Sequence, residues 1–387
     1  MQLYLHFPFC KRKCFYCDFC SASASAETVA AYCFALKKEI LMVGEKYRDE
    51  EVKTIFFGGG TPSIIPAPQM EELLKALTSS FRIKPDAEFT SEANPGTLRE
   101  DWLTVMRKYG LNRISLGVQS ANDELLTKIG RIHSFADAKN AVQLSRACGI
   151  KNLNVDMMFA LPSQTIEDYY QSIQAICALS PEHISAYSLI LEEGTALYDQ
   201  VNQGKVTLPS EDEAADMYVQ GIKWLAEHGY HQYEVSNFAK SGFECKHNIG
   251  YWQDENYLGL GVAAHSMLRA SKEQTKQGVK RIRKANTEDI VKYMTMLDDD
   301  LLPMDEELLI SSEEAMFETM MLGLRMTEGV DRQRFESLHG CQMTSVYEPE
   351  LSGLIKDGLA MWDGNQFTLT SRGLALQNDV LLRLMKD

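Results

Sequence analysis

The sequence has no uninterrupted apolar run as long as a membrane span, and its first residues, MQLYLHFPFCKRKC, contain no basic region followed by an apolar stretch. Stable membrane insertion and a secretion signal are therefore not expected, and the cytoplasm is the default location. No tract is rich in proline, serine or glutamine, which argues against long disordered segments. Positive charge is scarce: 39 Lys and Arg stand against 54 Asp and Glu, a formal net charge of −15. A field of that sign repels phosphate backbones, so nucleic acid is not an expected partner.

The rest of the composition is that of a folded protein. With 387 residues, 45% of them hydrophobic and 24% charged, the chain can bury one large α/β domain and a smaller appendage. Its nine cysteines are odd in number, and four of them fall within residues 10–20. In a reducing compartment, such crowding favours metal ligation over disulfides.

Short apolar runs alternate with amphipathic segments in the first half of the chain. The runs predict six strands, at residues 2–7, 54–59, 88–94, 113–120, 152–161 and 183–191. The segments between them predict helices near 27–46, 68–80, 99–109, 134–148 and 166–179. Repeated βα alternation predicts a parallel sheet with helices outside, and such sheets bind ligands at the carboxyl ends of their strands.

The pattern loosens after residue 200. A helix near 210–229 leads to an apolar strand, YHQYEVSNFA, and then to a stretch rich in glycine and aromatic residues, HNIGYWQDENYLGLGVAAHS. Residues 269–286 are charged and weakly apolar, which indicates a surface hairpin or loop. Near the carboxyl end, helix, hairpin and helix follow in an order like that of a winged-helix domain. The acidic run at 298–318 argues against DNA binding by it.

These patterns divide the chain into three expected domains. They are a βα core at 1–200, an α/β extension at 201–298 that carries HNIGYW, and a winged-helix-like domain at 299–387.

Three cysteines stand within eight residues directly after the first predicted strand, in the order Cys10-Lys-Arg-Lys-Cys14-Phe-Tyr-Cys17. An iron–sulfur cluster in an electron carrier normally has four protein ligands, so a set of three leaves one iron open to a substrate or cofactor. The alternative is a zinc site, to which Cys20 could contribute the fourth thiolate.

The spacing CxxxCx(aromatic)C resembles the signature of the radical S-adenosylmethionine (SAM) superfamily. The resemblance implies a [4Fe–4S] cluster on Cys10, Cys14 and Cys17. In that family the open iron binds the amino and carboxylate groups of SAM, and one electron from the cluster cleaves SAM to a 5′-deoxyadenosyl radical. The resemblance also implies a partial (β/α)6 barrel of the TIM-like, radical SAM type. Tyr16 stands where the family places an aromatic ring against the adenine.

A triple glycine ends the second predicted strand, followed by Thr61. Glycines let a backbone approach a ligand closely, although three in a row also suit a plain tight turn. The position one βα unit after the cysteines matches the family's glycine motif. The resemblance therefore assigns Gly59, Gly60 and Thr61 to the SAM amino group.

Polar residues stand near the ends of the next strands: Glu92, Gln119 and Asp156, with Arg131 in a following turn. By themselves they could cap helices or form a surface ion pair. Together with LYLHFPFC, FFGGGTPS, GVQS and DMMFALPSQT they resemble the HemN/HemW group, which is related to oxygen-independent coproporphyrinogen III dehydrogenase, over nearly the whole chain. In that group the Gln and Asp at these positions contact the SAM ribose, the Arg pairs with the methionyl carboxylate, and the Glu lies at the same surface.

The group contains two kinds of protein: the dehydrogenase, which oxidatively decarboxylates two propionates of coproporphyrinogen III, and heme chaperones. Three features favour the chaperone branch. The first cluster cysteine comes at residue 10, which leaves no room for the N-terminal extension of the enzyme branch. Cys17-Asp18-Phe19 replaces the CxC of that branch. The third feature is HNIGYW, which matches the HNxxYW motif of the chaperones. We therefore expect no dehydrogenase activity.

In the chaperone branch the histidine of this motif is associated with heme, which makes His247 the expected axial ligand. A lone histidine is more often a hydrogen-bonded structural residue, and Cys245 is an alternative soft ligand. The expected cofactors are a [4Fe–4S] cluster, SAM and heme. The expected partners are heme-accepting proteins, membrane-associated ones among them. The sequence does not predict the oligomeric state, and a dimer formed with heme is one alternative.

Overall fold

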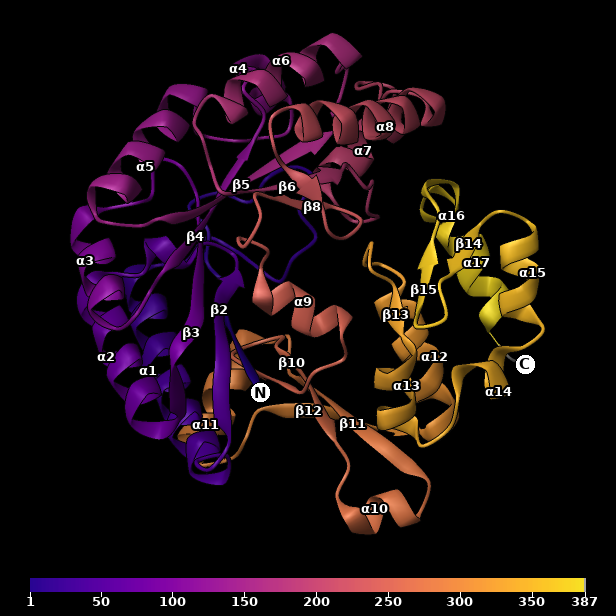
Figure 1. Cartoon of the computed structure of the whole chain (residues 1–387). Coiled ribbons are helices and arrows are strands. Elements are labelled where there is room, and N and C mark those ends of the chain that lie inside the picture. The colour runs from indigo at the N-terminus through magenta and orange to yellow at the C-terminus, as the bar shows by residue number, and fades with distance from the viewer. Residues whose placement is uncertain (386–387) are drawn as a thin grey trace.

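The structure is a computed structural model that describes residues 1–385. Six parallel strands form its centre, and all six follow the predicted order. They are β1 (Gln2–Phe7), β2 (Glu51–Gly59), β3 (Arg82–Ala93), β4 (Arg113–Gln119), β5 (Asn152–Phe159) and β6 (His183–Ser188). The strands curve into the expected partial barrel, and β2 and β3 begin earlier than the sequence pattern indicated (Figure 1).

Helices cover the outer face of this sheet (Figure 1). They are α1 (Ala26–Lys46), α2 (Ala67–Ser80), α3 (Glu100–Lys108), α4 (Asp123–Lys128), α5 (Phe135–Ala147) and α6 (Ile166–Cys177), with a short 3₁₀ turn at Pro62–Ile64. Capping boxes stabilise the amino ends of two of these helices. Ser134 pairs with Asp137 at the start of α5, and Thr165 pairs with Asp168 at the start of α6. The five expected crossover helices are confirmed.

The strands alternate between two environments. In β1, Leu3, Leu5 and Phe7 are fully buried in the main hydrophobic core. Gln2 and His6 alternate with them along the strand and make hydrogen bonds on the other face, inside the barrel. Because successive side chains of a strand point to opposite faces, the barrel interior receives a polar set while the outer face receives the apolar one.

The second half of the chain extends the sheet at both ends. It contributes α7 (Ala196–Asn202), α8 (Glu211–Glu227), β7 (His231–Gln232), β8 (Asn237–Ala239), α9 (Lys246–Trp252), β9 (Tyr257–Leu260), β10 (His265–Arg269), α10 (Lys272–Lys276), β11 (Val279–Asn286), α11 (Ile290–Asp298) and β12 (Met304–Ser311). Within residues 1–385 the resulting sheet has the order β12-β11-β10-β9-β1-β2-β3-β4-β5-β6-β8-β7.

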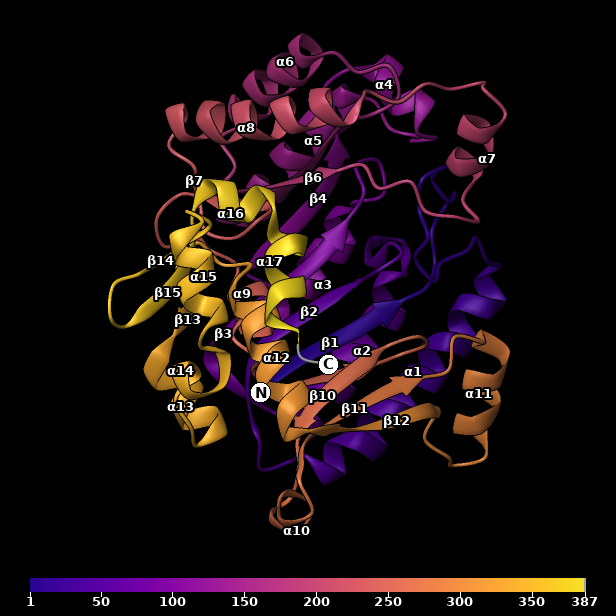
Figure 2. The same cartoon turned by 90° about the vertical axis from the view of Figure 1, so that its right-hand side faces the viewer.

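Two features of this extension matter below. Strand β1 lies between β2 and β9, so that Gln2 is opposite both Thr54 and Tyr257. The segment 269–286 forms the expected hairpin, but β11 pairs with β10 and β12 and so belongs to the main sheet rather than to a detached surface loop (Figure 2).

The carboxyl-terminal part has a hydrophobic core of its own, made of residues between Met320 and Leu384. It contains α12 (Ser312–Gly323), β13 (Val330–Asp331), α13 (Arg332–His339), α14 (Met343–Tyr347), α15 (Glu350–Lys356), β14 (Ala360–Trp362), β15 (Gln366–Leu369), α16 (Ser371–Ala375) and α17 (Gln377–Leu384). The three strands form a small antiparallel sheet, in the winged-helix-like arrangement expected from the sequence. Short α9 lies between this part and the strands of the barrel (Figure 1). None of the helices in residues 1–385 is long and apolar enough to cross a membrane.

Candidate functional site

A cavity of about 130 Å³ opens at the carboxyl ends of the parallel strands, where the sequence placed the site. Its wall brings together segments that are far apart in the chain. It contains the thiols Cys10, Cys14 and Cys17 and seven of the eight expected SAM contacts, namely Tyr16, Gly59, Gly60, Glu92, Gln119, Arg131 and Asp156. Thr61, the eighth, lies just behind the wall and is fully buried.

The loop with the three cysteines follows β1 and is fixed from both sides. The Thr61 hydroxyl lies 3.3 Å from the Cys10 Sγ, and Arg131 donates a hydrogen bond to the Cys14 Sγ over 3.5 Å. Burial raises the pKa of Cys17. The guanidinium places a positive charge beside the Cys14 sulfur, where it would offset negative charge on a ligating sulfur.

The glycines of the second strand are explained by contacts within the protein. A Cβ on Gly59, at φ +103°, would lie 2.4 Å from the His6 ring, and one on Gly60 would lie 2.6 Å from the Phe9 carbonyl. The Gly60 amide donates to the Phe7 carbonyl over 2.8 Å. The missing side chains of these glycines therefore let their turn pack closely against β1 and the start of the cysteine loop. Both glycines also line the cavity.

Two carboxylates stand in the wall. Glu92 accepts a hydrogen bond from the Gly59 amide over 3.1 Å, and burial together with nearby Asp156 raises its pKa to about 8. Asp156 accepts from Asn154 over 2.7 Å and from Ser115 over 3.0 Å, and burial also raises its pKa. Paired buried carboxylates disfavour each other's charge, so a cationic ligand between them would be stabilised.

Gln119 has a strained backbone. Its φ is +70°, and the register of β4 against β5 shifts between Gly117 and Gln119. A non-glycine residue in the left-handed region costs about 1–3 kcal/mol and is found where the surrounding structure imposes it, often at ligand sites. Within residues 1–385 its side-chain amide makes no hydrogen bond to protein, and the residue lines the cavity.

Arg131 is held by a residue that the sequence analysis missed. Asn94 accepts a hydrogen bond from the Arg131 guanidinium over 2.6 Å and donates to the Thr61 hydroxyl over 2.8 Å. It connects the arginine to Cys10 through Thr61. The Arg131 Nε is buried without a partner in the described part of the chain. The sequence feature that could have indicated Asn94 is its position two residues after Glu92, at the same strand end.

These side chains suit an iron–sulfur cluster with SAM beside it. Residues 1–385 contain no group of three or more His, Cys, Asp or Glu side chains arranged around a single metal ion. Ligands of one zinc ion lie within about 4 Å of each other, whereas a cubane separates its thiolates further. Three thiols along one wall, flanked by Arg131 and unpaired Gln119, fit the wider group.

His247 lies apart from this cavity, inside the other end of the barrel. Only 1% of it is exposed, and its ring stacks on Phe56 with centroids 5.1 Å apart. Its Nδ1 is 2.8 Å from the Thr54 hydroxyl and its Nε2 is 3.2 Å from the Tyr251 hydroxyl. Burial lowers its pKa to about 3, so the ring is neutral. In this arrangement neither ring nitrogen is free for a metal.

The helix that carries His247, α9, is held at its amino end by Glu88. This carboxylate accepts from the backbone amides of Lys246 and His247, both over 3.0 Å, and from the Cys245 thiol over 3.4 Å. Burial raises the pKa of Cys245 to about 12, so its sulfur is a neutral thiol.

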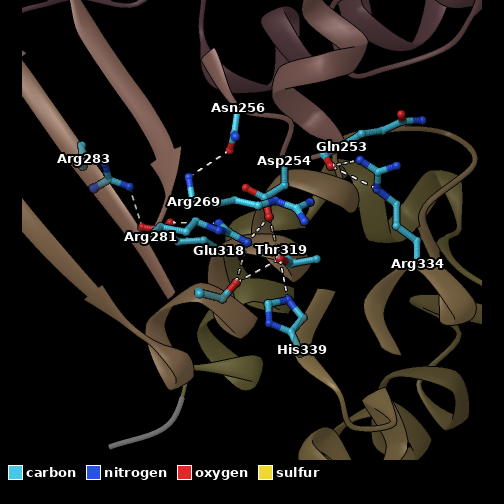
Figure 3. A network of polar contacts seen from close by, with 11 residues as sticks. Gln253, Asp254, Asn256, Arg269, Arg281, Arg283, Glu318, Thr319, Arg334 and His339 are labelled. Atoms are coloured by element: carbon cyan, nitrogen blue, oxygen red, sulfur yellow. Dashed lines mark hydrogen bonds and ion pairs between the residues drawn. The ribbon is translucent and has the colours of Figure 1, made fainter. Parts of the chain in front are cut away.

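The carboxyl end of α9 is held by the extension and the carboxyl-terminal part (Figure 3). Arg281 of β11 pairs with Asp254, just beyond the helix, and Thr319 of α12 donates to the same carboxylate. Arg334 of α13 donates two hydrogen bonds to the Gln253 carbonyl, one of them over 3.1 Å. The Arg281 and Asp254 side chains are 7% and 4% exposed, so the pair is shielded from water and salt. Elements from both halves of the chain therefore fix α9.

Comparisons with known proteins agree over almost the full length. The family models that match are the Radical SAM superfamily, at residues 4–176, and the HemN C-terminal domain, at residues 310–376. The chain is 35% identical to the heme chaperone HemW of Bacillus subtilis over 97% of each protein. It is 33% identical to the heme chaperone HemW of Escherichia coli over 98% of this chain and 97% of the relative. The solved structure of E. coli coproporphyrinogen III oxidase (HemN), a radical SAM enzyme, covers 99% of this chain and 89% of that one with a TM-score of 0.83. At 22% identity this likeness shows a shared fold.

Proposed function

Because the chain belongs to the radical SAM superfamily and, within it, to the HemN/HemW group, we propose that it is a heme chaperone. It holds a [4Fe–4S] cluster on Cys10, Cys14 and Cys17, binds SAM beside the cluster, and hands heme to acceptor proteins. The observation that carries the proposal is the convergence of the three thiols and the strand-end residues on one cavity.

Different residues of this cavity bind different parts of SAM. A cluster with one open iron supplies a site for the amino and carboxylate groups of SAM. Arg131, already fixed by Asn94, offsets the carboxylate charge. Asp156 and Gln119 bind the ribose hydroxyls, and Tyr16 packs against the adenine. Glu92 and Asp156 together favour a ligand that carries the positive charge of a sulfonium.

Heme binding is supported by the similarity of this chain to heme chaperones and by the HNIGYW segment. Ligation through His247 requires α9 to move, because both ring nitrogens are hydrogen-bonded and the ring is buried. Cys245 is less suited than His247, since its raised pKa keeps the sulfur protonated. The proposal therefore includes an open state in which α9 leaves the strands and exposes His247.

The decisive experiment measures heme binding and porphyrinogen turnover separately. Anaerobically reconstituted protein is titrated with heme and followed by the Soret band, with His247→Ala beside the wild type. We expect stoichiometric binding by the wild type and a changed spectrum with weaker binding by the variant. In a second assay, SAM, a reductant and coproporphyrinogen III are supplied, with a known dehydrogenase as positive control, and we expect no protoporphyrinogen IX.

A control variant separates ligation from loss of a hydrogen-bonded ring. His228 also has both ring nitrogens hydrogen-bonded, to the Trp224 carbonyl and to Gln174, but is half-buried at the C-cap of outer helix α8. His228→Ala should leave the heme spectrum unchanged. If His247→Ala binds heme with the wild-type spectrum and affinity, the ligand is another residue. Sustained turnover at the rate of the control enzyme would replace the chaperone proposal by the dehydrogenase.

A further inference from the structure

A chain of buried hydrogen bonds runs through the barrel from the SAM cavity to α9. It begins at Asp156, which accepts from the Asn154 side-chain amide over 2.7 Å. The Asn154 oxygen is 2.6 Å from the His183 Nδ1, and the His183 Nε2 is 2.8 Å from the Tyr233 hydroxyl. The Tyr233 oxygen accepts from the backbone amide of Cys245 over 3.3 Å, at the first turn of α9.

The donors and acceptors of this chain have one consistent direction. Asn154 gives its amide protons to Asp156 and, over 2.7 Å, to the Ser115 hydroxyl, so its oxygen is left to accept from the His183 Nδ1. The His183 Nε2 must then accept, and the Tyr233 hydroxyl donates to it. This requires a neutral imidazole, which its complete burial ensures by lowering its pKa.

The direction has an energetic consequence. Hydrogen bonds in series polarise one another, most of all in a buried environment that screens them weakly. A negative charge on Asp156 strengthens the bond from Asn154 and, through His183, the bonds that Tyr233 makes. A rotated Asn154 would point its oxygen at the carboxylate, so Tyr233 and His183 also hold the amide in the orientation that serves Asp156.

We infer that Tyr233 and His183 are positioning residues that orient the Asp156 carboxylate for SAM and couple the SAM cavity to α9. The inference rests on the proposed function, since it names the regulation of the same site. The positive sulfonium of SAM favours the ionised form of Asp156, and that charge tightens the hold of Tyr233 on the Cys245 amide through the chain. Release of α9 weakens SAM binding by the same path. Coupling between two binding events is reciprocal, so movement of α9 for heme and occupancy by SAM oppose each other to the same degree.

The test compares two tyrosines that each lose only a hydroxyl. Tyr233→Phe breaks the chain. Tyr230→Phe is the matched control, because Tyr230 is equally buried and its hydroxyl donates over 2.7 Å to the Pro181 carbonyl, outside the chain. SAM affinity is measured by anaerobic equilibrium dialysis of reconstituted protein. We expect Tyr233→Phe to weaken SAM binding about threefold to tenfold and Tyr230→Phe to change it by less than about twofold.

A double-mutant cycle shows whether the effect passes through Asp156. In an Asp156→Asn background, adding Tyr233→Phe should change SAM affinity by less than about twofold, because the carboxylate that the chain orients is gone. Equal SAM affinities for Tyr233→Phe and Tyr230→Phe would overturn the inference alone, and so would an undiminished effect in the Asp156→Asn background. No SAM binding by the wild type would overturn the proposed function as well.

A second measurement reports on α9 directly. Hydrogen exchange of the Cys245, Lys246 and His247 amides is followed in the wild type with and without SAM. SAM should slow exchange at Cys245 in the wild type and in Tyr230→Phe, but not in Tyr233→Phe. Equal exchange with and without SAM in the wild type would remove the coupling to α9 from the inference.

Discussion

Named side chains at the two ends of one barrel differ in how they use their polar atoms. At the carboxyl ends of the strands, the Arg131 Nε and the Gln119 side chain make no hydrogen bond within residues 1–385, and the Gln119 backbone is strained. At the amino ends, Glu88 and His247 are buried and use their polar atoms to hold α9 in place. Unpaired groups that face a cavity are available to a ligand, whereas saturated ones stabilise the fold. The comparison teaches that the cavity can accept a ligand without rearrangement. At the amino end, α9 would have to move before the His247 ring could bind one.

The largest effect is expected at the cavity end. Changing Cys10, Cys14 or Cys17 to Ala should abolish the cluster, while Cys20→Ala should leave about four irons per chain after anaerobic reconstitution. The physical reason is that three thiols line the cavity, whereas the Cys20 thiol points to the Glu288 carbonyl, 3.7 Å away. Iron content and the electron paramagnetic resonance signal are the measurements. Loss of the cluster in Cys20→Ala would mean that the ligand set is wrong.

A smaller loss is expected when the SAM contacts are removed one at a time. Asp156→Ala or Arg131→Ala should weaken SAM binding by about tenfold to a hundredfold, since a charge-assisted hydrogen bond contributes about 1.5–3 kcal/mol. Arg146→Ala is the control, because Arg146 pairs with Glu182 and does not line the cavity. Perturbation of the reduced cluster's paramagnetic signal by SAM reports binding. Wild-type affinity in both cavity variants would show that neither residue belongs to the site.

The amino end should make folding sensitive to acid. The pKa of His247 is about 3 in the folded protein and about 6.5 when unfolded, so between these values only the unfolded chain takes the proton. The contribution of His247 to stability is therefore complete above pH 6.5 and falls as the pH drops toward 3. Below pH 6 we expect His247→Gln to reduce the pH slope of the free energy of unfolding by about 1.4 kcal/mol per pH unit.

Urea unfolding between pH 7.5 and 5 measures this slope. The raised pKa of Glu92, about 8, acts in the opposite sense, since its contribution is lost as the pH rises through 8, so variants must be compared rather than absolute slopes. Tyr251→Phe removes a contact of the same ring without adding or removing a group that titrates here, and its slope should stay parallel to that of the wild type. An unchanged slope in His247→Gln would show that the ring is protonated in the folded state.

The smallest effect is expected where the carboxyl-terminal part holds α9. Arg334→Met keeps the aliphatic stem but removes the donors to the Gln253 carbonyl, and should lower the free energy of unfolding by about 1 kcal/mol. Arg332→Met, on the same helix α13, is the control, because its side chain is exposed. Faster hydrogen exchange near Gln253 should accompany the first change. Equal exchange in both variants would mean that Arg334 does not hold α9.

Most of the cavity could be read from the sequence because its signals are local. Three thiols after one strand and single polar residues at later strand ends need only the rule that parallel strands share a carboxyl edge. Asn94 was missed because an Asn before Pro95-Gly96 is typical of a turn, and only the fold shows it beside Arg131. Its role depends on three segments meeting, which no spacing reveals.

The amino end could not be read, for a different reason. Asn154 and His183 alternate with apolar residues in β5 and β6, and such alternation normally indicates a face in water. In a sheet curved into a partial barrel that face is the interior, where polar residues bond to each other. The helix α9 has only seven residues, too few to show a helical period, so neither its existence nor the burial of His247 was predicted.

The position of β1 between β2 and β9 means that β1 cannot complete its pairing until late in the synthesis of the chain. Gln2 pairs with Thr54 on one side and with Tyr257 on the other. At about 5–20 residues per second, the ribosome takes on the order of ten to fifty seconds to make the second partner after the first strand has emerged. Throughout that interval the strand that precedes the cysteine loop has one edge without a partner strand. Nascent chains stalled before β9 should therefore bind less iron than chains in which β9 has emerged.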